Sequence, residues 1–161
     1  MLKPLLVLAL LPTLAHARIG ETPEQCAKRY GDLAERKGAT ARAVHSFAKD
    51  GVVTTCFFTD GKCVAIRFEL IAPVRAGAQD TIENMPLFTD AQSAALLAAN
   101  SGDSEWTTLS KEQGITTHIA KDGTRRAVTS GLHVIIQTST DIEARKKFVM
   151  PDAVTKAIEG F

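Results

Sequence analysis

Three features of the sequence predict an α+β fold in which helices pack on one face of an antiparallel sheet. The pattern Thr-x-x-Gln occurs at Thr22 and again at Thr89, each time where a segment with helical spacing begins. Runs rich in β-formers follow, and Asp-Gly pairs, which favour hairpin turns, separate several of them. Ala-Lys-Asp-Gly occurs at 48–51 and again at 120–123. Together these repeats predict a tandem duplication of an α-β-β-β unit.

The first 17 residues are typical of a secretory signal peptide. Lys3 supplies a positive charge, an apolar run follows it, and Ala15-His16-Ala17 has the small-x-small pattern of a cleavage site. The run is shorter than the roughly 20 apolar residues that a membrane-spanning helix needs. We therefore expect cleavage near Ala17, no integral membrane span, and a secreted or periplasmic mature chain.

The first mature segment has clear helix boundaries. Thr22 is the expected N-cap, Pro23 suits the first helical position, and Gln25 can complete a capping box. Gly31 is expected to end the helix. So short a helix must dock on other elements to be stable in water. Three strands are predicted after it, and the alternation over 64–70 indicates one buried face.

The duplicated pattern sets the expected organisation of the rest. A polar stretch without clear periodicity separates the two units, and the second unit repeats the order of the first after a slightly longer helix. The sequence predicts a single α+β domain over 18–161, made of a first unit (18–70), a linker (71–88), a second unit (89–140) and short C-terminal helices (141–161).

Composition and motifs exclude several classes of function. The chain has 19 Lys and Arg against 18 Asp and Glu, so it lacks the basic surface that nucleic-acid binding requires. No G-x-S-x-G, H-E-x-x-H or P-loop pattern is present. We therefore expect no cofactor, no metal ligands and no catalytic residues of a standard kind.

The segment from Gly20 to Gly31 resembles the G-x-T-x-x-Q-V-x-x-x-L-G opening of SmpA/OmlA-type outer-membrane-assembly lipoproteins. It departs from that pattern at Cys26, where the family has an aliphatic residue, and it lacks a lipid-anchor cysteine. The duplicated order of elements resembles the β-lactamase-inhibitor-protein-like modules. Both resemblances imply a sheet with helices on one face, and a protein partner bound by the other face or its loops.

The three cysteines form the first group of candidate site residues. In an oxidising compartment, Cys26, Cys56 and Cys63 can form one disulfide and leave one thiol. Because Cys26 lies on the apolar stripe of the first helix, we predict that it pairs with a hairpin cysteine, Cys56 in preference to Cys63. A three-residue loop with a glycine bulge would place Cys56 on the buried face, and a two-residue turn would place it outside beside Cys63. The alternative is a thiol nucleophile with His45 as its base.

The second group is a candidate partner surface. Phe57 and Phe58 are adjacent in one strand and must point to opposite faces, so one of them is expected on the less buried face. His133 and Gln137 alternate with buried positions, and His118 and an arginine are expected beside them if they share that face. The candidate surface comprises Phe57, Phe58, Arg125, His118, His133 and Gln137.

These features favour a secreted or periplasmic module that binds a protein or has a structural role, without catalysis. Its expected partner is another envelope or secreted protein. Two alternatives stay open: a small envelope thiol enzyme or hydrolase using Cys56 or Cys63, and an inhibitor of a secreted enzyme.

Overall fold

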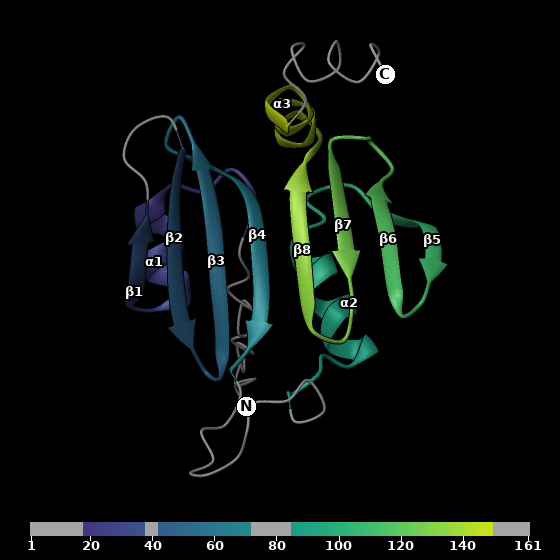
Figure 1. The fold of residues 1–161 in the computed structure, drawn as a ribbon, viewed down its shortest axis with the longest axis horizontal. Helices are drawn as coiled ribbons and strands as arrows, with labels where there is room; N and C mark the ends of the chain where they lie inside the picture. The colour runs from purple at the N-terminus through teal and green to yellow at the C-terminus, as the bar shows by residue number, and fades with distance from the viewer. Residues whose placement is uncertain (1–17, 38–41, 72–84, 150–161) are drawn as a thin grey trace, which may run out of the picture.

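The computed structural model describes residues 18–37, 42–71 and 85–149. In this part of the chain, eight strands form one antiparallel sheet in the order β1-β2-β3-β4-β8-β7-β6-β5 (Figure 1). The predicted signal peptide, most of the predicted linker and the end of the C-terminal segment lie outside the described residues. The sheet and its three helices confirm the α+β class.

Each of the first two helices is followed by four strands. The first half contains α1 (Pro23–Tyr30), β1 (Leu33–Lys37), β2 (Arg42–Lys49), β3 (Val52–Thr59) and β4 (Lys62–Leu70). The second half contains α2 (Asp90–Ala99), β5 (Trp106–Glu112), β6 (Ile115–Ala120), β7 (Arg125–Thr129) and β8 (His133–Thr138), and α3 (Ser139–Val149) follows.

The prediction of three strands after each helix is therefore wrong by one strand in each half. The missed strands are β1 and β5, which lie at the two edges of the sheet. Their sequences, LAERK and WTTLSKE, are mostly polar and exposed, so they lack the alternation that marks a half-buried strand.

Both predicted helix starts are confirmed as capping boxes. The backbone N–H of Gln25 donates to Thr22 Oγ1 at 3.4 Å, and the N–H of Thr22 donates to Gln25 Oε1 at 2.8 Å. Thr89 and Gln92 repeat this exchange at 3.2 Å and 2.9 Å. Both helices thus satisfy backbone donors at their N-termini with the side chains that the sequence predicts.

The two predicted Asp-Gly hairpin turns are also present. Asp50 and Gly51 both have positive φ, as do Asp60 and Gly61, which is the conformation that a two-residue type I′ turn requires. They connect β2 to β3 and β3 to β4, with Lys49 paired with Val52 and Thr59 paired with Lys62.

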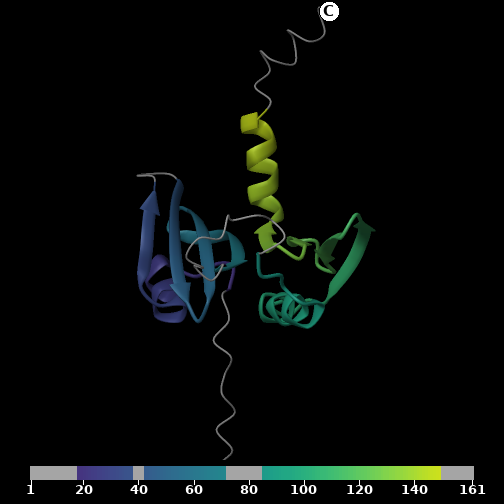
Figure 2. The same cartoon turned by 60° about the horizontal axis from the view of Figure 1, so that its bottom comes forward.

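The two faces of the sheet differ in what covers them. α1 and α2 lie on one face, here called the helix face, whereas α3 leaves the end of β8 and projects on the opposite side, the outer face (Figure 2). The core lies under α1 and α2 and is formed by buried side chains such as Phe47, Ile66, Val134 and Ile136. Ile66 and Ile136 pair across the contact between β4 and β8, which joins the two halves at the centre of the sheet.

Candidate functional site

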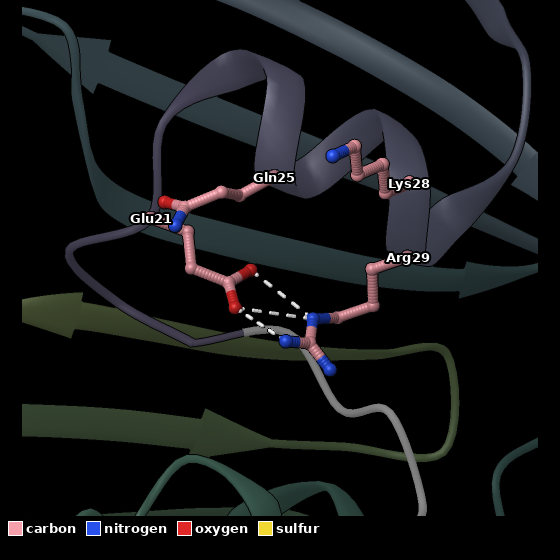
Figure 3. A pocket seen from close by; sticks show the side chains of 4 residues that line it. All are labelled: Glu21, Gln25, Lys28 and Arg29. Atoms are coloured by element: carbon pink, nitrogen blue, oxygen red, sulfur yellow. Dashed lines mark hydrogen bonds and ion pairs between the residues drawn. The ribbon is translucent and has the colours of Figure 1, made fainter.

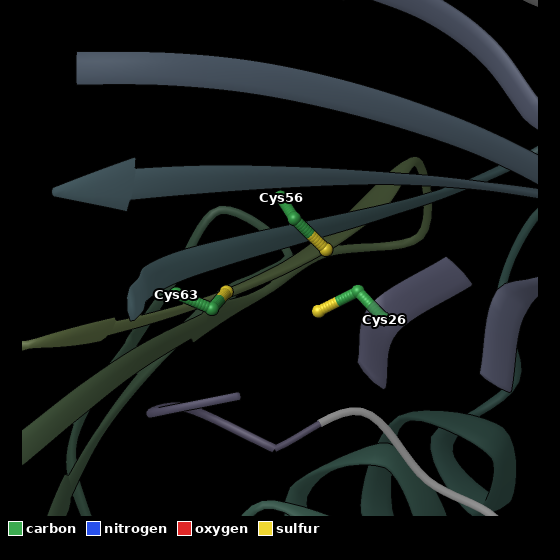
Figure 4. A group of neighbouring side chains, drawn as sticks. All are labelled: Cys26, Cys56 and Cys63. Atoms are coloured by element: carbon green, nitrogen blue, oxygen red, sulfur yellow. The ribbon is translucent and has the colours of Figure 1, made fainter. Parts of the chain in front are cut away.

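The three cysteines converge in the core of the first half. Cys26 comes from α1, Cys56 from β3 and Cys63 from β4, and their side chains point toward one another (Figure 4). The three Sγ atoms all lie within 4.8 Å of one another. The exposed fractions of the side chains are 0%, 0% and 1%, so the cluster is closed to solvent. All three are free thiols in this structure.

A β-bulge brings both hairpin cysteines to the helix face. The turn between β3 and β4 has two residues, but the register shifts between Phe57 and Phe58. As a result Cys56 pairs with Ile66, and Phe58 pairs with Cys63. We expected a two-residue turn to put Cys56 on the outer face, and this is wrong. The bulge adds one residue to β4, so Cys56 pairs with the buried Ile66 and lies on the helix face.

Backbone hydrogen bonds fix α1 over these strands. The N–H of Gly20 donates to the carbonyl of Cys63 at 2.7 Å, and the N–H of Cys63 donates to the carbonyl of Glu21 at 2.8 Å. The segment that leads into α1 is thus tied to the residue that carries one of the three sulfurs. Cys26 lies in the first turn of α1, so this connection holds it over β3 and β4.

An ion pair holds the far end of the helix to the same segment. Arg29 Nε donates to Glu21 Oε1 at 3.1 Å and Nη2 donates to it at 2.6 Å, as Figure 3 shows. Both side chains are partly buried. Such a multiply bonded arginine–carboxylate pair restricts the orientation of α1 as well as adding energy.

Hydrogen bonds among the three sulfurs favour deprotonation of Cys26 over the other two. Hydrogen bonds from Cys56 and Cys63, helped by the charge of Arg29, lower the pKa of Cys26 to about 4. The pKa values of Cys56 and Cys63 are raised, chiefly because of their hydrogen bonds with the Cys26 sulfur and also because they are buried. The Cys63 thiol also donates to the carbonyl of Ala65 at 3.4 Å. Cys26 is therefore the thiol most readily deprotonated.

Tyr30, one helical turn after Cys26, borders this cluster. Its ring packs against Phe47 and Phe68 at centroid distances of 5.8 Å and 6.4 Å. Its buried hydroxyl finds no hydrogen-bond partner among the described residues. Burial raises the pKa of Tyr30, and the three nearby cysteines raise it further. The phenol is thus a buried donor without a partner among the described residues, in the same core cluster as the cysteines.

The geometry is unfavourable for a thiol nucleophile. His45 pairs with Cys56 across β2 and β3, but it is only 4% exposed and its ring lies 5.0 Å from that of Phe58. A nucleophile and its base must both reach a substrate. Here the thiols and the imidazole are enclosed by the core.

The candidate partner surface divides between the two faces. Phe57, His133 and Gln137 lie on the outer face, since Phe57 and Gln137 both pair with Ala65 and His133 pairs with Glu69. Phe58 is 2% exposed and belongs to the core.

His118 and Arg125 are also on the helix face, which corrects the expectation that they share a face with His133. His118 pairs with the fully buried Ala127, and Arg125 lies two residues before Ala127 in β7. Arg125 Nη1 donates to the carbonyl of Asn100 at 2.8 Å. Of the two adjacent arginines, Arg126 is the one on the outer face, because it pairs with Gln137.

Two outer-face features were missed by the sequence analysis. Arg67 and Glu69 form an ion pair at 2.7 Å on β4, and the guanidinium of Arg145 lies 5.3 Å from the centroid of the Phe57 ring. The alternation of β4 could have indicated the first feature. The second depends on where α3 turns after β8, and no local pattern specifies that direction.

A separate cavity of about 440 Å³ lies between α2 and the neighbouring strands. Leu97, Trp106 and His118 are among the residues that line it. Trp106 Nε1 donates to the carbonyl of Leu97 at 2.7 Å, and both ring nitrogens of His118 contact threonine hydroxyls. The polar groups of these side chains are therefore engaged within the protein.

Comparisons with known proteins give limited similarity. No family model and no curated protein matches the chain. A crystal structure of a cysteine-rich secretory protein from Staphylococcus aureus subsp. aureus Mu50 is similar at 12% identity and a TM-score of 0.43, covering 77% of this chain and 46% of that one. An extracellular SCP-domain protein from Bacillus anthracis str. Ames is similar at 8% identity and a TM-score of 0.38, covering 75% and 44%.

This chain therefore corresponds to less than half of either protein, and similarity of this degree supports no statement about function. In the part of the chain that the structure describes, no helix has the length and apolar character needed to cross a membrane.

Proposed function

We propose that the chain is an exported, non-catalytic module that binds another envelope or secreted protein through the outer face of its sheet. The observation that carries this proposal is a set of partly exposed apolar side chains on the central strands of that face. They are Val53 and Phe57 on β3, Val128 on β7 and Ile135 on β8.

The register places two of these side chains, Ile135 and Val128, next to one another. On β4, Arg67 pairs with Ile135, Glu69 with Val53 and Ala65 with Phe57, so polar and small side chains of β4 lie between the apolar side chains of β3 and those of the second half. An open antiparallel face usually carries polar residues at such positions. Partly exposed apolar side chains set among polar groups offer a partner both apolar area to bury and polar groups to pair with, as binding surfaces do.

Polar groups on the same face can orient a partner. Arg67 holds Glu69 through one nitrogen, while its Nε is buried without a hydrogen-bond partner among the described residues. The Arg67 side chain as a whole is 43% exposed, so the accessible part of its guanidinium could donate to a carbonyl or carboxylate of a bound protein.

Export, duplication and a disulfide belong to the same proposal. The signal-peptide pattern of residues 1–17 supports export. The matching capping boxes and the similar order of elements in the two halves support descent from a duplicated unit. The proximity of the three sulfurs supports a disulfide from Cys26 in an oxidising compartment.

The alternative of a thiol enzyme has less support than protein binding, because the three sulfurs are enclosed in the core. Inhibition of a secreted enzyme is a special case of protein binding, in which the bound partner would lose activity.

Site-specific photo-cross-linking in intact envelopes tests the proposal. A photoreactive residue at Thr55, on the outer face of β3, should capture one protein in stoichiometric amount, and Arg67→Glu should abolish that capture. The matched control places the same photoreactive residue at Lys28, an exposed position on α1. It should not capture the protein that Thr55 captures. Capture from Lys28 alone, or no capture from Thr55, would contradict the assignment of the outer face.

A further inference from the structure

We propose that the reduced protein binds one soft, thiophilic metal ion of the Cu(I) type between Cys26, Cys56 and Cys63. Nothing in the sequence patterns indicates this site, because the three residues do not have the spacing of a known metal motif. The fold alone assembles them, from one helix and two strands.

The distances suit a three-coordinate ion. A metal–thiolate bond of about 2.3 Å places three sulfurs around a central ion roughly 4 Å apart. The three Sγ atoms already lie within 4.8 Å of one another. A contraction of less than about 1 Å, available from side-chain rotation, would therefore complete the site.

The ligand set selects the class of ion. Structural zinc sites have four protein ligands in a tetrahedron. Among the described residues, no histidine, aspartate or glutamate joins the three cysteines within the same distance. Soft thiolate ligands favour Cu(I), which accepts a lower coordination number than zinc. A buried site with three sulfurs and no hard ligand thus favours Cu(I) over Zn(II).

The surroundings hold the ligands in place and exclude water. Ile66 and Phe58 are 0% and 2% exposed, and both belong to the core around the cluster. Cys63 is fixed by its two backbone hydrogen bonds to Gly20 and Glu21. Enclosure by apolar side chains controls solvent access to a metal site, which protects a bound ion from exchange.

The free hydroxyl of Tyr30 is a second, independent observation. It is a buried donor without a hydrogen-bond partner among the described residues, and Tyr30 belongs to the same core cluster as the three cysteines. A metal-bound thiolate can accept such a hydrogen bond. The hydroxyl bonds to none of the three sulfurs in this structure, so this contact would form when the ligands contract around the ion. Tyr30 would then be a positioning residue, acting through a sulfur ligand rather than on the ion.

Metal binding and disulfide formation use the same atoms. A disulfide between any two of the cysteines removes two of the three ligands. The ion-binding form is therefore the fully reduced protein, and oxidation is expected to abolish binding.

The test is an anaerobic titration of the reduced full chain with Cu(I), in competition with a chromogenic Cu(I) chelator. The chain has only three cysteines, so every thiolate ligand must come from this cluster. We expect one ion per chain, three sulfur neighbours by X-ray absorption spectroscopy, and release of protons on binding. Zn(II), titrated separately in competition with a Zn(II) indicator, should bind more weakly.

Variants separate ligands from neighbours. Cys26→Ser, Cys56→Ser and Cys63→Ser should each weaken Cu(I) binding by more than about 100-fold, and Tyr30→Phe by about 10-fold with the stoichiometry unchanged. Ile66→Val, a buried neighbour without a donor atom, should leave the affinity unchanged.

Two sulfur neighbours instead of three, no binding, or tighter binding of Zn(II) would overturn the proposal. The coordination number and proton release are measured on the unsubstituted protein, so they decide the question even where a serine variant fails to fold.

Discussion

Arg125 of β7 lies directly over Gly102, in the loop that follows α2. A Cβ atom added to Gly102 would lie 2.7 Å from Arg125 Nη1, and Gly102 has a φ of +58°. The same Nη1 donates to the carbonyl of Asn100, the C-cap residue of α2. Arg125 therefore anchors the end of α2 to the sheet, and the absence of a side chain at Gly102 makes this contact possible.

Gly102→Ala should destabilise the protein by about 2 kcal/mol, because it combines backbone strain at positive φ with displacement of the arginine. Gly123→Ala is the matched control, since Gly123 also has positive φ but has open space where its Cβ would lie. It should cost only about 1 kcal/mol. Urea denaturation measures both. Equal losses of stability would show that the contact with Arg125 contributes nothing.

Thr22→Ala and Thr89→Ala should each lower the free energy of unfolding by about 1 kcal/mol, because each removes the side-chain acceptor of a capping box. Thr22→Ser and Thr89→Ser retain an acceptor and should be nearly neutral. Thermal unfolding followed by circular dichroism gives the comparison. A serine variant as unstable as its alanine counterpart would contradict the role of the hydroxyl.

In protein from an oxidising compartment, Cys26 should be joined to Cys56, with Cys63 left as a free thiol. Closing this loop should stabilise the protein by about 3–4 kcal/mol in the chain-entropy model. Non-reducing peptide mapping identifies the pair, and unfolding with and without reductant measures the gain. Recovery of Cys26 as a free thiol from such protein would show the pairing to be wrong.

N-terminal sequencing of the exported protein should begin at Arg18, because cleavage is expected after Ala17. Substituting Ala17 with a bulky residue should block processing, since the cleavage site requires small residues. Arg18→Lys, on the other side of the expected bond, is the control and should be processed normally. Exported protein that retains Met1 would contradict the assignment of a leader.

Local chemistry explains why some elements could be predicted and others could not. The capping boxes at Thr22 and Thr89 and the Asp-Gly turns depend on a few adjacent residues, so the sequence reveals them directly. The edge strands β1 and β5 bury little and carry no periodicity. The pairing of β4 with β8 joins residues about 70 positions apart, and no local pattern encodes such a contact.

The candidate site shows the same limit. The apolar stripe of the first helix correctly indicated that Cys26 faces the sheet. The direction of Cys63 depends on the bulge opposite Phe57 and Phe58, which the alternation of β4 does not reveal. Arg125 and Arg126 are adjacent and point to opposite faces, so only the register of β7 decides which of them lies outside.

His118 should make the stability depend on pH below neutrality. Burial lowers the pKa of His118, so the folded protein favours the neutral ring more than the unfolded chain does. Its ring nitrogens lie 3.4 Å and 3.2 Å from the hydroxyls of Thr108 and Thr129, contacts that the neutral ring can keep. The resulting stabilisation is complete above the ordinary histidine pKa of about 6.5. It should be lost as the pH falls through the folded-state pKa.

The measurement compares the free energy of unfolding of the unsubstituted protein with that of His118→Gln between about pH 4 and pH 8, a window around the ordinary pKa. Glutamine can replace both hydrogen bonds but does not titrate in this range, so the difference between the two proteins should be constant above about pH 7 and should shrink on acidification. An NMR titration of the His118 ring in the folded protein gives the pKa directly. A value above the ordinary one, or a difference that grows as the pH falls, would contradict burial as the dominant effect, because a raised pKa would stabilise the folded protein at low pH instead.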